Sequence, residues 1–263
     1  MIKDIENKYA FVHLPCNAGS TVEYWLMQMN KHPNWKDRFQ SVVPSTGRIF
    51  ATDDGYVDIP VHDNYQDQLA ELEKVPGPLR MHMAAKANDD PNLKLYCIIR
   101  NPWERELTSW FHMTKWFNDK SRPEITSGIP EGKLDTFENW ITWKYVEIDA
   151  KKMMEAGLLE NYFSAALLRT DNGDNYNYTH DDDGKDLIDT YIRYENLQED
   201  WNAFAQKAGY PADIFKVKIN SNRKSEYNDK HYSYFYNDAI REILDPYCQR
   251  DCERFGYKFD TVD

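Results

Sequence analysis

The sequence predicts an α/β fold, with one domain over residues 1–263 and a mostly parallel central sheet flanked by helices. Apolar runs of strand length lie at 9–14, 93–99 and 190–194, and an amphipathic helical pattern follows each of them after a short polar turn. No internal repeat and no Pro- or Ser-rich linker divides the chain. Strands that alternate with helices in this way favour a parallel sheet, because each helix carries the chain back across the sheet.

The first strand is the run YAFVHL, and the short polar loop PCNAGST follows it at residues 15–21. Ser20 and Glu23 have the spacing of a capping box, which predicts that a helix starts there. An apolar stripe then continues at helical spacing through Val22, Trp25, Leu26 and Met29. A strand, a tight loop and a helix start present several backbone N–H groups to an anion.

The second strand, LKLYCII, has the continuous apolar character of a strand buried on both faces. Arg100 closes it, Asn101 is a typical N-cap residue, and Pro102 fits the first position of a helix. The third strand covers 190–194, and Leu197, Trp201, Phe204 and Ala205 form the core-facing stripe of the helix after it.

The remaining segments are less regular. We expect a helix from 234 to 255 with an interruption near Pro246, because proline removes a helical hydrogen bond. The other expectations are a turn-rich stretch at 45–77 with one helix near 65–74, two helices within 134–170, and a solvated loop at 171–186.

The formal net charge is −12, and the calculated isoelectric point is about 5.1. This acidity argues against nucleic acid or an anionic membrane as a partner, and any anionic ligand needs a local cluster of donors. The mean hydropathy is −0.80, and no apolar run approaches the ~18 residues of a membrane-spanning helix. Four cysteines and the absence of a secretory signal favour a cytoplasmic protein with buried thiols.

The loop at 15–21 lacks the Gly-Lys-Ser/Thr ending of a Walker A motif, which disfavours a nucleotide hydrolase of that type. Its pattern still suits an anion. The alternative is that Ser20 only caps the helix and Gly19 only relieves a turn, and the loop alone leaves both interpretations open.

The segment FVHLPCNAGSTVEYWL resembles the 5′-phosphosulfate loop of the carbohydrate-type sulfotransferases, F-I-H-I-P-K-T-A-G-T-S. His13, Pro15, Ala18, Gly19 and Glu23 match that family, and Ser20 and Thr21 transpose its usual Thr-Ser. The resemblance implies that the donor's phosphosulfate is held by Cys16, Asn17, Ala18, Gly19, Ser20 and Thr21. The family's lysine falls at Cys16, and a thiol cannot supply its positive charge.

The segment CIIRNPWERELTSWFH resembles the 3′-phosphate motif of the same family, R-N-P-x-x-R-x-x-S. The resemblance implies that Arg100 and Thr108 bind the 3′-phosphate, with Ser109 as the near alternative, and a guanidinium suits bidentate phosphate binding. The alternatives are a strand-end salt bridge for Arg100 and a hydroxyl bonded to its own helical turn for Thr108. Arg105 also matches the motif, and we expect it to be structural.

Two further segments follow the family's order. YIRYENLQEDW resembles its R-F/Y-E-N-L-x-x-D segment, in which Arg193 and Glu195 are expected to be framework charges. The stretch from 220 to 238 resembles a polar-basic loop that covers the donor nucleotide, so Arg223 and Lys224 are candidate phosphate contacts. Ordinary surface charge is an equal alternative for these two residues.

Transfer of a sulfuryl group needs a base for the acceptor hydroxyl, and a histidine suits this task. His82 lies in LRMHMAAK, and family members often carry His-x-x-Ala there, so His82 is the candidate base. The alternative is a histidine buried within the sheet. Lys86 or Lys115 could replace the missing lysine, or the loop amides and Arg100 act alone and turnover is slow. No His-x₃-His or Cys-x₂-Cys pair is present, and we expect no metal.

The resemblance therefore implies a P-loop-like sulfotransferase that uses 3′-phosphoadenosine-5′-phosphosulfate (PAPS) as its donor. The expected acceptor is a hydroxyl group, with a carbohydrate as its class. The alternative is a catalytically weak or inactive protein on the same fold that binds a nucleotide or a glycan. The substitution of Cys16 for the family's lysine keeps this alternative open.

Overall fold

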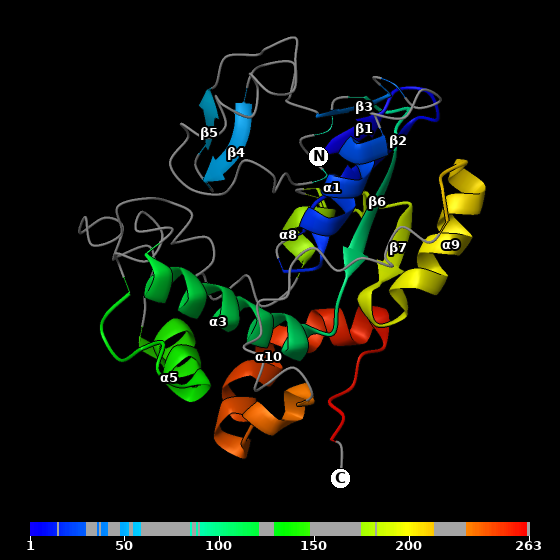
Figure 1. Cartoon of the computed structure of the whole chain (residues 1–263). Helices are drawn as coiled ribbons and strands as arrows, with labels where there is room; N and C mark the ends of the chain where they lie inside the picture. Colours follow the sequence, from blue (N-terminus) through cyan, green and yellow to red (C-terminus); the bar gives the residue numbers. More distant parts are fainter. Residues whose placement is uncertain are drawn as a thin grey trace. The chain divides into compact units, whose positions relative to one another are not determined.

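A computed structural model describes residues 1–14, 16–29, 36, 38–41, 48–52, 55–58, 85, 88, 90–120, 129–147, 175–181, 183–212 and 230–261 (Figure 1). The chain divides into two compact units. The sheet unit consists of Met1–Arg100 and Asn177–Ser221, and the helical unit consists of Asn101–Tyr176 and Asn222–Asp263. The single-domain organisation expected from the sequence stays a prediction.

The sheet unit contains a five-stranded sheet in the order β3-β1-β2-β6-β7. Strands β2 (Tyr9–Val12), β6 (Lys94–Ile99) and β7 (Thr190–Arg193) correspond to the three predicted strands, and they are parallel. Strand β1 (Ile2–Asp4) is antiparallel to both of its neighbours, so β3 (Phe39–Ser41) runs in the direction of β2. Four of the five strands thus share one direction, which confirms the predicted α/β class with a mostly parallel sheet.

Two helices pack with the strands of this sheet in one apolar core, namely α1 (Gly19–Met29) and α9 (Leu197–Ala208). The register aligns Phe11 with Tyr96 and Ile98 with Ile192, so these alternating side chains lie on one face. The core cluster includes Phe11, Val22, Leu26, Tyr96, Ile98, Ile192, Trp201 and Phe204. Ala10, Cys97 and Ile99 on the other face are buried as well, as is usual for parallel strands.

Four strands of the structure were not predicted. Strands β1 and β3 have three residues each, and the buried carboxylate of Asp4 in β1 pairs with Arg38, beside β3, at 2.8 Å from Nε. Strands β4 (Arg48–Thr52) and β5 (Gly55–Asp58) form an antiparallel pair within the stretch expected to consist of turns. Strands β1 and β3 are too short, and β4 and β5 too interrupted by polar and small residues, to show the apolar run that signals a buried strand.

The helical unit is built on α3 (Pro102–Asp119), α5 (Phe137–Thr142) and α10 (Asp238–Phe255). A π-helix, η4 (Trp143–Glu147), follows α5, and a short 3-10 helix, η9 (Tyr232–Phe235), precedes α10. The predicted cap is present, because the Asn101 side chain accepts from the N–H groups of Trp103 and Glu104. The predicted interruption of the last helix is wrong, since α10 continues through Pro246.

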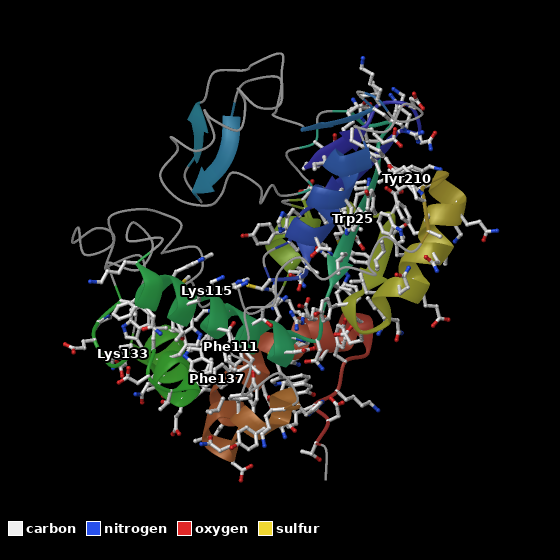
Figure 2. The ribbon with its side chains drawn as sticks, in the orientation of Figure 1. Trp25, Phe111, Lys115, Lys133, Phe137 and Tyr210 are labelled. Atoms are coloured by element: carbon white, nitrogen blue, oxygen red, sulfur yellow. The ribbon has the colours of Figure 1, made fainter. Side chains whose placement is uncertain are left out.

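Buried side chains join these helices. Phe111 of α3 and Phe137 of α5 lie in their core (Figure 2).

Two short helical elements lie elsewhere in the chain. A single helical turn, α8 (Tyr176–Thr179), lies within the stretch expected to be a solvated loop, and a 3-10 helix, η6 (Tyr194–Asn196), links β7 to α9. None of the described helices combines the length and the apolar character that crossing a membrane requires.

Candidate anion-binding site

The loop after β2 and the residue after β6 lie at the same edge of the sheet. Strands β2 and β6 are parallel, and Val12 is in register with Cys97, so the carboxyl ends of both strands lie at the same edge of the sheet. There the Arg100 Nη1 donates a hydrogen bond to the carbonyl oxygen of Cys16 at 3.3 Å, across 84 positions of sequence. The structure therefore brings together two of the segments that the sequence singled out.

The loop has an unusual backbone. Cys16 has φ 60° and Ala18 has φ 61°, in the left-handed region that non-glycine residues rarely adopt. Gly19, which follows Ala18, is already helical, and the Thr21 N–H donates to the Ala18 carbonyl at 3.0 Å. A left-handed residue next to a right-handed one turns successive N–H groups toward one side, which forms an anion-binding concavity at the start of a helix.

Gly19 makes room for a histidine. His13 follows β2 and is 3% exposed, and a Cβ atom added to Gly19 would overlap its imidazole ring. The φ of Gly19 is not positive, so glycine is required here for close packing against His13 and not for a left-handed conformation. Helix α1 begins at Gly19, which places Ser20 inside the first turn instead of at the predicted N-cap.

The guanidinium of Arg100 is held on a tyrosine ring. Its Cζ lies 3.9 Å from the centroid of Tyr194, the first residue after β7, and Arg100 is only 6% exposed. Such a contact orients the planar group and attracts its charge. Sequence reasoning missed Tyr194. The sequence feature that could have indicated it is an aromatic residue at the end of β7, the strand next to β6.

The loop side chains differ in exposure. Asn17 is 1% exposed, and Cys16 is half-buried. Ala18 and Thr21 are half-buried as well, whereas only the backbone of Ser20 is described. Arg100 contacts this loop through the backbone carbonyl of Cys16.

The two candidate hydroxyls of α3 have different environments. Thr108 Oγ1 donates to the Glu104 carbonyl at 2.9 Å, which is the bond within its own turn named above as the alternative. Ser109 is 4% exposed, and its Oγ has no hydrogen-bond partner within the described part of the chain. A buried polar group without a partner often marks a ligand or water position, so Ser109 is the better candidate of the pair. Both residues belong to the helical unit, whereas the loop and Arg100 belong to the sheet unit.

Several predicted residues fall elsewhere. His82, Lys86, Arg223 and Lys224 lie outside the described residues, and Lys115 is exposed on α3 (Figure 2). Arg105 forms a buried ion pair with Asp251 at 2.9 Å, in keeping with the structural role expected of it. Among the residues described, no three His, Cys, Asp or Glu side chains gather as a metal site requires.

Comparisons with protein-family models, with curated proteins and with solved structures found no match for the chain.

Proposed function

We propose that this protein is a sulfotransferase that binds PAPS and transfers its sulfuryl group to a hydroxyl of a carbohydrate acceptor. The observation that carries the proposal is the contact of Arg100 with Cys16. It joins the two segments whose residues resemble the 5′-phosphosulfate loop and the 3′-phosphate motif. The parallel pair β2–β6, with the loop and a helix start after β2, supports a P-loop-like sulfotransferase fold.

The site supplies local positive potential to a protein with a net charge of −12. The N–H groups of residues 16–19 offer fixed dipoles at the start of α1, and Arg100 adds a full charge at the same edge of the sheet. These groups are candidates to hold the phosphosulfate and to stabilise the charge on the leaving phosphate. Thr108 or Ser109, Arg223 and Lys224 remain candidates from the resemblance.

The donor supplies an activated sulfuryl group. In the transfer, a bond forms between the acceptor oxygen and sulfur, and the bond from sulfur to the phosphate oxygen breaks. The hydroxyl proton moves to a base, for which His82 is the candidate, and the negative charge stays on the leaving nucleotide. Positioning and fixed dipoles dominate such in-line transfers, so a preorganised loop is a large part of the catalysis.

A second candidate function is nucleotide or glycan binding without transfer. The observation in its favour is Cys16, which stands where the resembling family has a lysine beside the leaving oxygen. Loss of one such donor typically lowers a rate by 10²–10³, which corresponds to about 3–4 kcal/mol. Binding depends less on this group than turnover does, because the charge to be stabilised develops in the transition state.

Calorimetry with 3′,5′-adenosine bisphosphate tests the binding site. We expect the wild-type chain to bind and Arg100→Ala to lose at least tenfold in affinity. Arg100→Lys keeps the positive charge but lacks the planar guanidinium, so it should retain part of the wild-type affinity. Lys207→Ala, an exposed site in the last turn of α9, is the matched control and should bind like wild type. Unchanged binding in Arg100→Ala would contradict the proposed site.

A labelled sulfate-transfer screen over glycans separates the two functions. If the wild type transfers sulfate and His82→Ala does not, the enzyme proposal and its base are supported. If the wild type is inert and Cys16→Lys gains transfer, the natural chain is a binding protein. Activity that His82→Ala leaves unchanged would show that His82 is not the base.

A further inference from the structure

Within the helical unit, the segment after α10 packs against the start of α3 and against η9 through a phenylalanine. The ring of Phe259 is surrounded by Trp103, Tyr232 and Tyr236, each with its ring centroid at 5.4 Å. The guanidinium of Arg241 lies over the same ring, with its Cζ at 4.1 Å from the centroid. Edge-on aromatic contacts of this kind add to the apolar area that they bury, so Phe259 anchors the segment.

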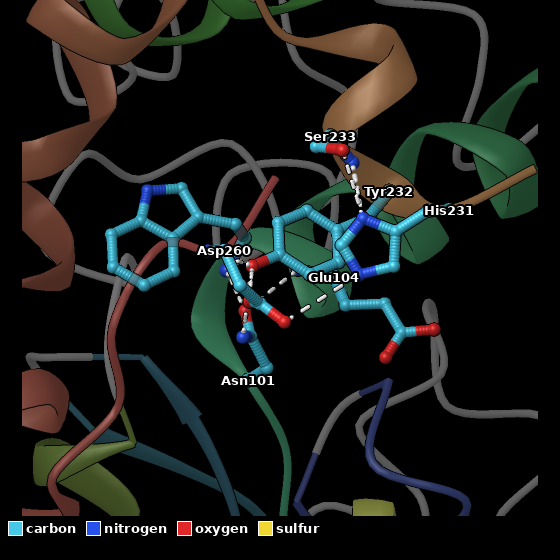
Figure 3. Close-up of polar contacts among 7 residues, drawn as sticks. Asn101, Glu104, His231, Tyr232, Ser233 and Asp260 are labelled. Carbon is cyan, nitrogen blue, oxygen red and sulfur yellow. Dashed lines mark hydrogen bonds and ion pairs between the residues drawn. The ribbon is translucent and has the colours of Figure 1, made fainter. Parts of the chain in front are cut away.

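Asp260, the next residue, forms hydrogen bonds to one tyrosine with both its side chain and its backbone (Figure 3). The Tyr232 hydroxyl donates to Asp260 Oδ1, and the Asp260 N–H donates back to the Tyr232 oxygen at 2.9 Å. His231 Nε2 lies 3.7 Å from the other carboxylate oxygen. Tyr232 is 4% exposed, and burial raises its pKa above the ordinary value, so its hydroxyl keeps the proton that it donates.

The same hydroxyl reaches the cap of α3. Asn101 Nδ2 donates to the Tyr232 oxygen at 3.4 Å, while Asn101 Oδ1 accepts from the N–H groups of Trp103 at 3.1 Å and Glu104 at 3.3 Å. A flipped amide would turn its N–H₂ group toward those N–H donors, where no bond can form. The acceptor on Tyr232 therefore favours the amide orientation that caps the helix.

Asn101 is also the residue directly after Arg100, the cation of the candidate anion site. Because loss of an N-cap destabilises the first turn of a helix, we expect it to loosen the start of α3 and the backbone at Arg100 next to it. A displacement of about 1 Å at a binding group is enough to weaken a preorganised site.

We propose that Phe259 and Asp260 form a strap that acts through Tyr232 to hold the Asn101 cap, and so positions the start of α3 and the Arg100 before it. Tyr232 and Asp260 are positioning residues in this proposal. The strap itself stands on the contacts of the helical unit, whereas its effect on anion binding rests on the proposed function.

Two readouts test the strap. Tyr232→Phe removes only the hydroxyl and keeps the ring against Phe259. We expect amide exchange in the first turn of α3 to become roughly fivefold faster, the scale of a lost N-cap, and the affinity for 3′,5′-adenosine bisphosphate to fall several-fold. Asp260→Ala, which removes the acceptor of the Tyr232 hydroxyl, should act in the same direction. Tyr234→Phe, which alters a tyrosine that is 64% exposed, is the matched control and should change neither.

The role of the Asn101 cap can be tested separately in a double variant. Asn101→Ser caps a helix without an amide that needs orienting, so Tyr232→Phe should add no increase in exchange at Trp103 and Glu104 in that background. Unchanged exchange in Tyr232→Phe would overturn the strap. Faster exchange with unchanged affinity would overturn its positioning of Arg100. A wild type that binds no nucleotide would overturn the proposed function, while the exchange data would still decide the strap.

Discussion

Position 19 requires glycine because of its neighbour His13. Gly19 has no side chain, and the His13 ring fills the space that a Cβ atom would occupy. Gly19→Ala should therefore destabilise the fold by about 2 kcal/mol, within the range for overpacked cores, and should disturb the loop that Arg100 contacts. Denaturant unfolding measures the first effect, and nucleotide calorimetry measures the second.

His13→Ala provides the control, because removal of the ring should make Gly19→Ala nearly neutral in the double variant. Gly256→Ala is a second control. It has φ 72° and no atom within 4 Å of the added Cβ, so it should cost only the left-handed strain of about 1 kcal/mol. Additive losses in the His13 and Gly19 double variant would contradict the packing argument.

Asp4 links stability to pH. Burial raises its pKa, but hydrogen bonds from Arg38 and from the N–H groups of Asn7 and Glu6 outweigh burial, so the pKa lies below the ordinary 3.8. A lowered pKa in the folded state means that this stabilisation is present above the unfolded value and is lost as the pH falls through the folded value. Wild type should thus exceed Asp4→Asn in stability at pH 6, and the gap should narrow below pH 4. Urea unfolding across that range measures the gap, and a constant gap would exclude this linkage.

The sequence could predict those contacts of the site that follow from the order and direction of the strands. The approach of Arg100 to the loop follows from two parallel strands that end at one edge. The left-handed conformations of Cys16 and Ala18 were not predictable, because neither residue type favours them. The support of Arg100 by Tyr194 also needed the register of β6 with β7.

At the scale of elements, one buried carboxylate holds α3 to α5 and the π-helix. Glu106 of α3 accepts from Lys144 Nζ at 2.8 and 2.9 Å, from Trp140 Nε1 at 3.1 Å and from the Tyr145 hydroxyl at 2.9 Å. Trp140 belongs to α5, whereas Lys144 and Tyr145 belong to the π-helix that follows it. Donors from two consecutive helices thus meet on one carboxyl group of α3.

Glu106→Gln should be strongly destabilising, because it leaves the Lys144 ammonium buried without its countercharge. We expect a loss of about 3–5 kcal/mol in the free energy of unfolding. The matched control is Glu147→Gln, which breaks the exposed pair with Lys133 and should cost less than about 1 kcal/mol. Equal losses in the two variants would refute the role of the buried pair, and Lys144→Met should recover part of the Glu106→Gln loss.

The elements that the sequence predicted correctly are those with long apolar patterns, such as β6 and the stripe of α9. The π-helix escaped prediction because the expected helical period is 3.6 residues. Pro246 removes one backbone hydrogen bond from α10, but Ile240, Leu244 and Cys248 on both sides of it are buried. This burial outweighs the lost hydrogen bond, so the helix continues through the proline.

At the scale of the whole molecule, a net charge of −12 sets the conditions for an anionic ligand. The long-range field opposes its approach, whereas Arg100 and the loop act at short range. Since added salt screens long-range repulsion more than close contacts, the association rate of 3′,5′-adenosine bisphosphate should rise about twofold between 20 and 150 mM salt. Stopped-flow measurements test this, and a rate that falls steeply with salt would indicate a positively charged approach surface.

The order of the strands in the sheet also bears on how the chain is made. Tyr9 pairs with Lys94, and Tyr96 pairs with Thr190, so each parallel partner leaves the ribosome long after the strand that it joins. The hairpin of β1 and β2 can form early, but one edge stays open until β6 is synthesised. An unpaired edge of this kind invites association with other chains. In this topology the open edge of β2 is protected only once β6 pairs with it.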